Sequence, residues 1–268
     1  MSKRVVVIGG GNMGTAIVAG MVKSGTYLQN QITIIEASHE RHDFLKGEFK
    51  ETAVVADLNE PVKVADIIIL AVKPNVFSEL LPTIAEFIHP ETVIVSVAAG
   101  LQIKTIAKLL GDDYKIVRTM PNLPAAVSEG MTVLAPNTLV NATDLAHVKA
   151  IFDGCGKTEV LDEKHFDAVT ALSGSSPAMI FMFIEAMADG AVLKGIPRRQ
   201  AYNIAAQAVL GSVKFFAESG KHPGELKDMV CSPGGTTIEM VSTLEATGFR
   251  SSILQAISDC ADKSASMK

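Results

Sequence analysis

The sequence has no tryptophan, and phenylalanine and tyrosine bring its aromatic share to only 5%. Because 48% of the residues are nevertheless hydrophobic, the core must be filled mainly by aliphatic side chains and methionine. Only three cysteines are present, Cys155, Cys231 and Cys260, and no two of them form a CxxC pair. An odd and widely spaced set excludes a disulfide scaffold and predicts a reducing, cytoplasmic setting.

An excess of positive charge is also missing. The net charge is -5, and no basic run is longer than Arg198-Arg199, so we expect no nucleic-acid partner. The most apolar later run, residues 178–184, is far shorter than the roughly 20 residues that span a bilayer, so we expect no membrane partner. The apolar run after Arg4 is too short for a targeting segment. The six histidines show no ligand spacing, so we predict no metal site.

Short runs rich in valine and isoleucine alternate with helix-like segments through the first half of the chain. Nearly continuous apolar runs of this length are typical of strands buried on both faces of a parallel sheet. We predict strands at residues 4–8, 32–35, 67–72, 93–97, 115–119, 131–135 and 158–161, and helices at residues 12–24, 39–46, 75–87, 103–110 and 143–152. The alternation predicts an α/β fold with a doubly wound parallel sheet.

The second half changes character, because no convincing strand follows residue 161. Helical patterns occupy residues 163–172, 177–194, 198–219, 236–247 and 251–263. We predict a dinucleotide-binding domain at residues 1–161 and an all-helical domain at residues 162–268. Alanine, methionine and leucine lie on more than one side of these helices, and an apolar helix has to be covered. We expect a second copy of the chain to cover it.

A glycine-rich segment links the first predicted strand to the first predicted helix. Gly9, Gly11 and Gly14 form a GxGxxG pattern, in which the first glycine permits a tight turn and the third brings helix and strand close. The second glycine lets backbone amides approach a pyrophosphate at the helix N-terminus. The bland alternative is a flexible turn, but the strand and helix around it favour a Rossmann-type coenzyme site. We assign it to a run of seven residues: Ile8, Gly9, Gly10, Gly11, Asn12, Met13 and Gly14.

An acidic residue follows the second predicted strand. A carboxylate at the position of Glu36 accepts hydrogen bonds from the ribose hydroxyls of NAD and repels the additional phosphate of NADP. The alternative is a solvated loop residue. Ser38, His39 and Arg41 follow closely and could form a phosphate pocket instead. The sequence therefore leaves NADH and NADPH both open.

Three further loops follow predicted strands. Because the carboxyl ends of parallel strands share one edge of a sheet, their coincidence is more informative than any one loop. Small residues there let the nicotinamide half of the coenzyme lie against backbone. We assign to the coenzyme the residues Ala71, Val72, Lys73, Pro74, Ala98, Ala99, Gly100 and Asn122, and we add Asn59.

The helical half contains a Ser-Pro-Gly-Gly-Thr-Thr segment, residues 232–237. Its purely structural interpretation is a helix start at which hydroxyls cap exposed amides. The functional interpretation uses the same physics, because free N–H groups and hydroxyls also form a cradle for a small carboxylate.

Taken together, the motifs resemble those of the pyrroline-5-carboxylate reductase family. They are the glycine fingerprint, the AVKP, AAG and MPN loops, the SGSSPA turn at residues 173–178, the GIPRR turn at residues 195–199 and the SPGGTT segment. The resemblance covers essentially the whole chain. It implies a Rossmann domain followed by a helical dimerisation and substrate-binding domain, with dimers that sometimes build decamers. It also implies an active site between one subunit's coenzyme domain and the dimer module.

The resemblance further implies a reaction and residue roles. NAD(P)H would reduce the cyclic imine 1-pyrroline-5-carboxylate to L-proline, the last step of proline biosynthesis. The family often prefers NADPH, so Glu36 is unexpected. Thr237 would act near the ring nitrogen as the catalytic residue. The substrate would be bound by Ser175, Val230, Ser232, Gly234, Gly235, Thr236 and Thr237.

Two alternatives remain, and the first of them, a β-hydroxyacid dehydrogenase, shares the two-domain plan. A β-hydroxyacid dehydrogenase typically uses a lysine on the helix between its domains, and residues 173–179 contain none. A catalytically silent NAD(P)-sensing or scaffold protein is the other alternative. Only the reductase would turn over pyrroline-5-carboxylate, so an assay of that turnover distinguishes it from both alternatives.

Overall fold

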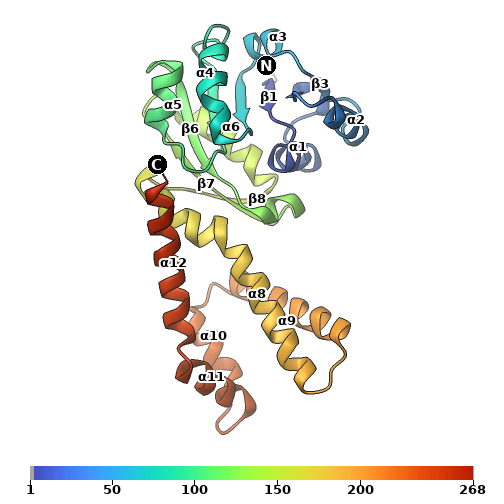
Figure 1. Cartoon of the computed structure of the whole chain (residues 1–268), viewed down its shortest axis with the longest axis vertical. Helices are drawn as coiled ribbons and strands as arrows, with labels where there is room; N and C mark the ends of the chain where they lie inside the picture. The colour runs from blue at the N-terminus through green and yellow to red at the C-terminus, as the bar shows by residue number, and fades with distance from the viewer. Residues whose placement is uncertain (1–2, 268) are drawn as a thin grey trace. The chain divides into compact units, whose positions relative to one another are not determined.

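The computed structural model describes residues 3–267. Its first half is built on one eight-stranded sheet with the strand order β3-β2-β1-β4-β5-β6-β7-β8 (Figure 1). The strands are β1 (Val5–Ile8), β2 (Ile32–Ile35), β3 (Ala53–Val55), β4 (Ile67–Leu70), β5 (Val93–Ser96), β6 (Lys115–Met120), β7 (Gly130–Pro136) and β8 (Gly156–Val160). All pairs are parallel except β6–β7, which is antiparallel. The predicted doubly wound, parallel-dominant sheet is confirmed.

Helices cover both faces of this sheet, which explains why its central strands are apolar throughout. On one face α1 (Asn12–Ser24) and α6 (Ala142–Asp153) pack against alternate strand residues such as Val5 and Val7. On the other, α4 (Phe77–Ala85) and α5 (Ile103–Leu110) pack against the intervening residues, such as Val6 and Ile8. Helix α2 (His39–Glu48) follows β2, and the short helix α3 (Asn59–Lys63) follows β3.

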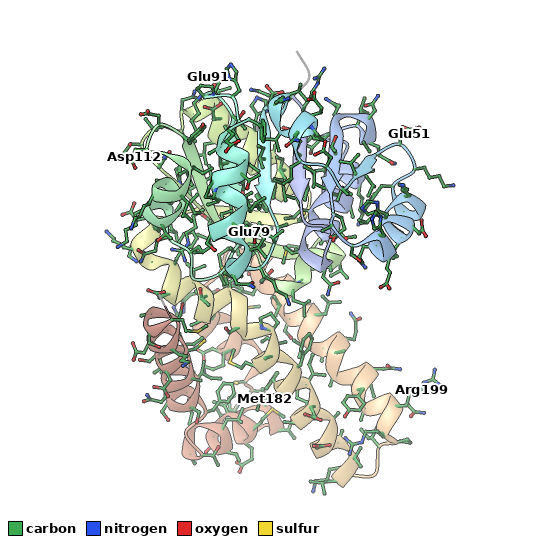
Figure 2. The ribbon with its side chains drawn as sticks, turned by 45° about the horizontal axis from the view of Figure 1, so that its top comes forward. Glu51, Glu79, Glu91, Asp112, Met182 and Arg199 are labelled. Atoms are coloured by element: carbon green, nitrogen blue, oxygen red, sulfur yellow. The ribbon has the colours of Figure 1, made fainter. Side chains whose placement is uncertain are left out.

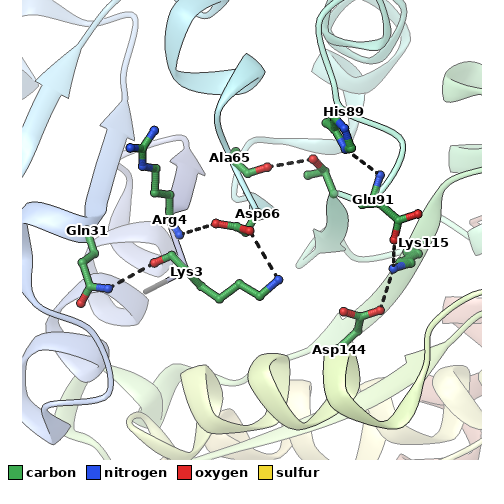
Figure 3. A network of polar contacts seen from close by, with 10 residues as sticks. Lys3, Arg4, Gln31, Ala65, Asp66, His89, Glu91, Lys115 and Asp144 are labelled. Carbon is green, nitrogen blue, oxygen red and sulfur yellow. Dashed lines mark hydrogen bonds and ion pairs between the residues drawn. The ribbon is translucent and has the colours of Figure 1, made fainter. Parts of the chain in front are cut away.

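Polar contacts join the amino ends of the strands (Figure 3). Asp66, just before β4, accepts a hydrogen bond from the Arg4 amide at 2.8 Å. At the start of β6, Lys115 lies 2.6 Å from a Glu91 carboxylate oxygen and 3.0 Å from one of Asp144. Thr92 donates to the Ala65 carbonyl at 2.8 Å. These contacts fix the edge opposite to the one where ligands of such sheets bind.

The helical half consists of α8 (Ser176–Leu193), α9 (Arg198–Ser219), α10 (Pro223–Val230), α11 (Thr236–Ala246) and α12 (Phe249–Ser266). Few of their residues are buried within one chain, and large apolar side chains face outward, as Met182 does in Figure 2. Those that are more than half exposed include Phe181, Met182, Ile204, Leu210, Phe215, Met240 and Leu254. One chain alone leaves these helices uncovered, as the sequence predicts.

The predicted helix at residues 163–172 is irregular in the structure. It comprises the 3-10 helix η4 (Glu163–His165), the short helix α7 (Phe166–Val169) and the π-helix η5 (Thr170–Ser175). Together with α8 they form a continuous run, Glu163–Leu193, which is long and apolar enough by length and composition to cross a membrane. Only 6% of its most apolar window is buried within the chain, and a helix covered by a second subunit has the same properties. The expectation of no membrane partner stays a prediction.

Among the strands and α-helices, three elements were not predicted: β3, α3 and α10. The compact units also divide later than the predicted boundary at residue 162. The first unit extends to Gly174 and includes the segment from Cys260 onward, and the second comprises Ser175–Asp259. Within the first unit, Ser264 donates to an Asp167 carboxylate oxygen at 3.0 Å, which ties the end of α12 to α7.

Candidate functional site

The glycine loop after β1 has no room for side chains at two of its positions. Gly9 has φ +106°, and a Cβ there would lie 2.6 Å from the Ala71 carbonyl oxygen. A Cβ on Gly14 would lie 2.0 Å from the Gly9 carbonyl oxygen. Both distances are impossible for real atoms, so these glycines are required by the turn and by the contact between helix and strand.

Gly11 is different, because a Cβ there would meet nothing within 4 Å. It is the N-cap of α1, and no side chain caps this helix. The first amides of α1, from Asn12 onward, have no helical carbonyl to bond and point at this open space. A helix N-terminus with open backbone binds anions, so the loop fits the pyrophosphate of a dinucleotide.

Glu36 lies directly beside this loop, one residue beyond β2. Its Oε2 accepts a hydrogen bond from the Gly10 amide at 2.7 Å, and its Oε1 accepts one from the Ser38 amide at 2.9 Å. His42 holds the Glu36 backbone carbonyl, with Nε2 2.6 Å from that oxygen. The carboxylate therefore faces the glycine loop rather than open solvent, as a ribose-binding acid would.

Arg41 reaches the same loop from α2. Its Nη2 donates to the Gly10 carbonyl at 2.6 Å and lies 3.3 Å from the Thr15 hydroxyl. The guanidinium also stacks 4.6 Å from the ring centroid of Phe44. Glu36, the predicted ribose-binding acid, and Arg41, a predicted phosphate-binding cation, thus both bind Gly10. Ser38 donates its backbone amide to Glu36.

The next two predicted loops lie at the same edge of the sheet. The Ala71 amide bonds the Ile8 carbonyl at 2.8 Å, so the loop after β4 continues alongside β1. Lys73 is the N-cap of the 3-10 helix η2 (Pro74–Val76). After β5, Ala98 is buried, while Gly100 has φ +80° and open space where a Cβ would lie. Small residues thus leave backbone accessible along this edge.

Asn122 and Asn59 have local roles that the sequence did not reveal. Asn122 donates from Nδ2 to the carbonyl and hydroxyl oxygens of Ser173, at 3.3 and 3.2 Å, and accepts from the Met131 amide at 2.9 Å. Its side chain therefore fastens η5 and β7 to the end of β6, and its backbone carbonyl accepts a hydrogen bond from the Ala125 amide at 3.1 Å. Asn59 is the exposed first residue of α3, and its amide donates to Asp57 at 3.2 Å.

In the second unit, the SPGGTT segment joins α10 to α11. Gly234 has φ +67°, which favours glycine, and a Cβ on Gly235 would lie 2.4 Å from the Ser232 hydroxyl oxygen. Gly235 is the N-cap of α11, and no side chain caps this helix. The amides of Thr236 and Thr237 therefore begin the helix without helical partners. This geometry confirms a helix start and leaves donors for an anion.

An open hollow lies at this helix start, lined by Gly234, Gly235, Thr236, Ile238 and Glu239. Glu239 was not among the predicted residues, although its position in the first turn of a helix was readable from the sequence. Val230 ends α10 with its side chain exposed. Ser175 is the N-cap of α8. Within residues 3–267, no three histidine, cysteine or acidic side chains are placed to hold a metal ion.

Both halves of the chain match families of known proteins. Residues 4–100 match a family model described as NADP oxidoreductase, coenzyme F420-dependent. Residues 163–267 match one described as pyrroline-5-carboxylate reductase dimerisation. The pyrroline-5-carboxylate reductase of Escherichia coli (strain K12) is 48% identical over 264 residues, which cover 98% of each chain. That of Arabidopsis thaliana is 41% identical over 98% of this chain and 95% of its own.

Solved structures show the same likeness. A pyrroline-5-carboxylate reductase from Coxiella burnetii superposes with a TM-score of 0.96 at 29% identity, over 100% of this chain and 99% of its own. The Plasmodium falciparum pyrroline carboxylate reductase, solved with NADP bound, gives 0.87 at 30% identity, over 99% and 98% of the two chains.

Proposed function

Because the chain belongs to the pyrroline-5-carboxylate reductase family, it reduces 1-pyrroline-5-carboxylate to L-proline with NAD(P)H, and we propose how its residues divide that work. Bound NAD(P)H supplies the hydride for the imine carbon. The protein positions the two reactants and stabilises their charges, which is the main catalytic task in such a transfer. A β-hydroxyacid dehydrogenase would not account for the SPGGTT segment.

The coenzyme lies along the carboxyl edge of the first unit's sheet. The open backbone at Gly11 and the amides of Asn12 and Met13 bind its pyrophosphate. The ribose of the adenosine half lies near Glu36. The nicotinamide half extends along the small residues of the loops after β4 and β5, such as Ala71 and Gly100.

The substrate carboxylate binds at the start of α11. The amides of Thr236 and Thr237 and the Ser232 hydroxyl donate to it, and the helix dipole favours its negative charge. Gly235 shapes the turn, because its own amide bonds the Ser232 carbonyl at 3.0 Å. Val230 contributes backbone contact, Gly234 the turn, and Ser175 a further polar contact. A protonated imine needs no strong acid, so the Thr237 hydroxyl suffices to steer the ring nitrogen or its proton.

The coenzyme preference is a finer proposal. Glu36 faces the loop that holds the adenosine end, and its carboxylate favours a free ribose diol over a ribose phosphate. Arg41 lies at the same glycine and partly offsets that charge. The enzyme therefore uses NADH well and retains activity with NADPH.

The dimerisation model matched by residues 163–267 supports assembly of the helical half. The building block is a homodimer, and a decamer would contain five of them. Exposed apolar side chains such as Phe181, Met182 and Leu254 are the surface that assembly covers. A cytoplasmic setting suits a sequence with three widely spaced cysteines and no CxxC pair. Light scattering tests the assembly: a stable and active species of 28.3 kDa would contradict it.

One observation carries the catalytic proposal: the start of α11, at the SPGGTT segment, has no side-chain cap, so its first amides can bind a carboxylate. The test is turnover of 1-pyrroline-5-carboxylate by the purified chain, followed by coenzyme absorbance with NADH and with NADPH. Formation of proline confirms the reaction. Binding of coenzyme without turnover would instead favour a sensing or scaffold role.

A further inference from the structure

Arg118 is a buried cation that the reaction described above does not use. It lies in the middle of β6 with 2% of its surface exposed. Its Nη1 donates to Glu163 Oε1 at 2.9 Å, and its guanidinium lies 4.6 Å from the ring centroid of Phe166. A charge so deeply buried is stable only when it is paired and hydrogen-bonded.

Glu163 connects this cation to a coenzyme loop. The same Oε1 atom accepts a hydrogen bond from the Ile103 amide at 2.7 Å. Ile103 is the first residue of α5, which follows the small-residue loop at residues 98–100. A carboxylate at a helix N-terminus is favoured by the free amides and the helix dipole. Glu163 therefore caps α5 from a distant part of the chain and fixes where that loop ends.

The whole segment from Glu163 to η5 is fastened to the β6–β7 region. Phe166 and Val169 pack with Val133 and Ala135 in a small apolar cluster. At the far end, Asn122, which follows β6, holds Ser173. The Arg118–Glu163 ion pair thus links strand β6 to the start of α5, and so to the end of the loop at residues 98–100.

We propose that Arg118 and Glu163 are positioning residues that orient the 98–100 loop, and with it the nicotinamide end of the coenzyme, for hydride transfer. This inference rests on the proposed function. An apolar pair of similar volume would fill the same space without the cost of desolvating two charges. What such a pair lacks is the directional contact that links β6 to the first turn of α5.

The test compares the double variant R118M/E163M with wild type in the full chain. Both charges are removed, so no unpaired charge is left to unfold the protein. We expect a thermal midpoint close to that of wild type, with kcat per folded protein reduced by about tenfold or more, as for a misoriented reactant. The KM for the coenzyme should rise while that for pyrroline-5-carboxylate changes little, a split that a merely structural role would not produce.

The matched control is the ion pair between Lys115, the first residue of β6, and Asp144. K115M/D144N removes an ion pair of 3.0 Å that lies away from the coenzyme edge, and kcat per folded protein should not change. R118K retains the charge and should recover most of the lost kcat. Equal kinetics for R118M/E163M and K115M/D144N would overturn the proposal.

Failure of the proposed function and failure of the positioning role give different results. If wild type itself does not reduce pyrroline-5-carboxylate, the proposed function fails, whatever the variants do. If wild type turns over and the folded R118M/E163M variant is equally active, only the positioning role fails. Should that variant not fold, E163Q decides, because it keeps the size of Glu163 and an acceptor oxygen but removes the charge that pairs with Arg118. Wild-type coenzyme KM and kcat in folded E163Q would refute the role.

Discussion

Glu36 and Arg41 bind the same residue of the glycine loop, with opposite charges. Glu36 accepts from the Gly10 amide at 2.7 Å, and Arg41 donates to the Gly10 carbonyl at 2.6 Å. A carboxylate at this place favours a ribose diol, whereas a guanidinium favours a ribose phosphate. We therefore expect the balance between these two side chains to set the coenzyme preference.

Replacing Glu36 with serine should shift that preference toward NADPH. The carboxylate that repels a phosphate is lost while Arg41 remains, so the specificity ratio should change by about 1 kcal/mol or more, several-fold in kcat/KM. Steady-state kinetics with both coenzymes measure this ratio. The control is Glu40→Ser, an exposed acid on α2, which should leave the ratio unchanged. An equal shift in both variants would mean that only overall charge matters.

Two glycines of the loop should respond differently to alanine. At Gly14 the new Cβ would lie 2.0 Å from the Gly9 carbonyl oxygen, so Gly14→Ala should lower the free energy of unfolding by about 2 kcal/mol or more. At Gly11 the space is open, so Gly11→Ala should preserve the thermal midpoint but weaken NAD(P)H binding.

Calorimetry and coenzyme fluorescence separate these two effects. Gly47→Ala, within α2 and with open space around it, is the control and should stabilise the protein by about 0.4–1 kcal/mol. Unimpaired coenzyme binding by Gly11→Ala would show that the pyrophosphate lies elsewhere.

Thr237→Ala should reduce turnover without unfolding the protein, because one hydroxyl near the transition state is lost. We expect a decrease in kcat of at least about tenfold, typical of a modest hydrogen bond. Thr243→Ala, an exposed position on the same helix, is the comparison. Normal kinetics in a folded Thr237→Ala variant would remove this hydroxyl from the mechanism.

Cys155 should make the protein less stable at alkaline pH. Burial raises the pKa of its thiol from 9.0 to about 11, so the unfolded chain loses this proton at lower pH than the folded one. Stability therefore falls as pH rises from about 9 toward 11, by about 1.4 kcal/mol per pH unit from this group. Chemical denaturation at several pH values should show a shallower decline for Cys155→Ala. Parallel curves would assign the decline to other groups.

The sequence was sufficient where one physical pattern dominated. The valine and isoleucine runs placed β1, β2, β4, β5 and β6, because a strand buried on both faces needs apolar residues throughout. Strand β3 was not predicted because it has only three residues and lies at the sheet edge. Helix α10 was not predicted because its proline and glycine are typical of a turn. The contacts of Asn122 and Arg118 join segments far apart in the chain, and no local pattern encodes such pairs.

The first unit takes its residues from both sides of the helical insertion, which affects how the protein is made. Ser264, on the segment from Cys260 onward, bonds Asp167 across that gap in sequence. On a translating ribosome, the nucleotide-binding unit remains incomplete until the helical unit has been synthesised after it. Its last packing contacts then form only once α12 emerges, so the order of synthesis delays completion of the part that is encoded first.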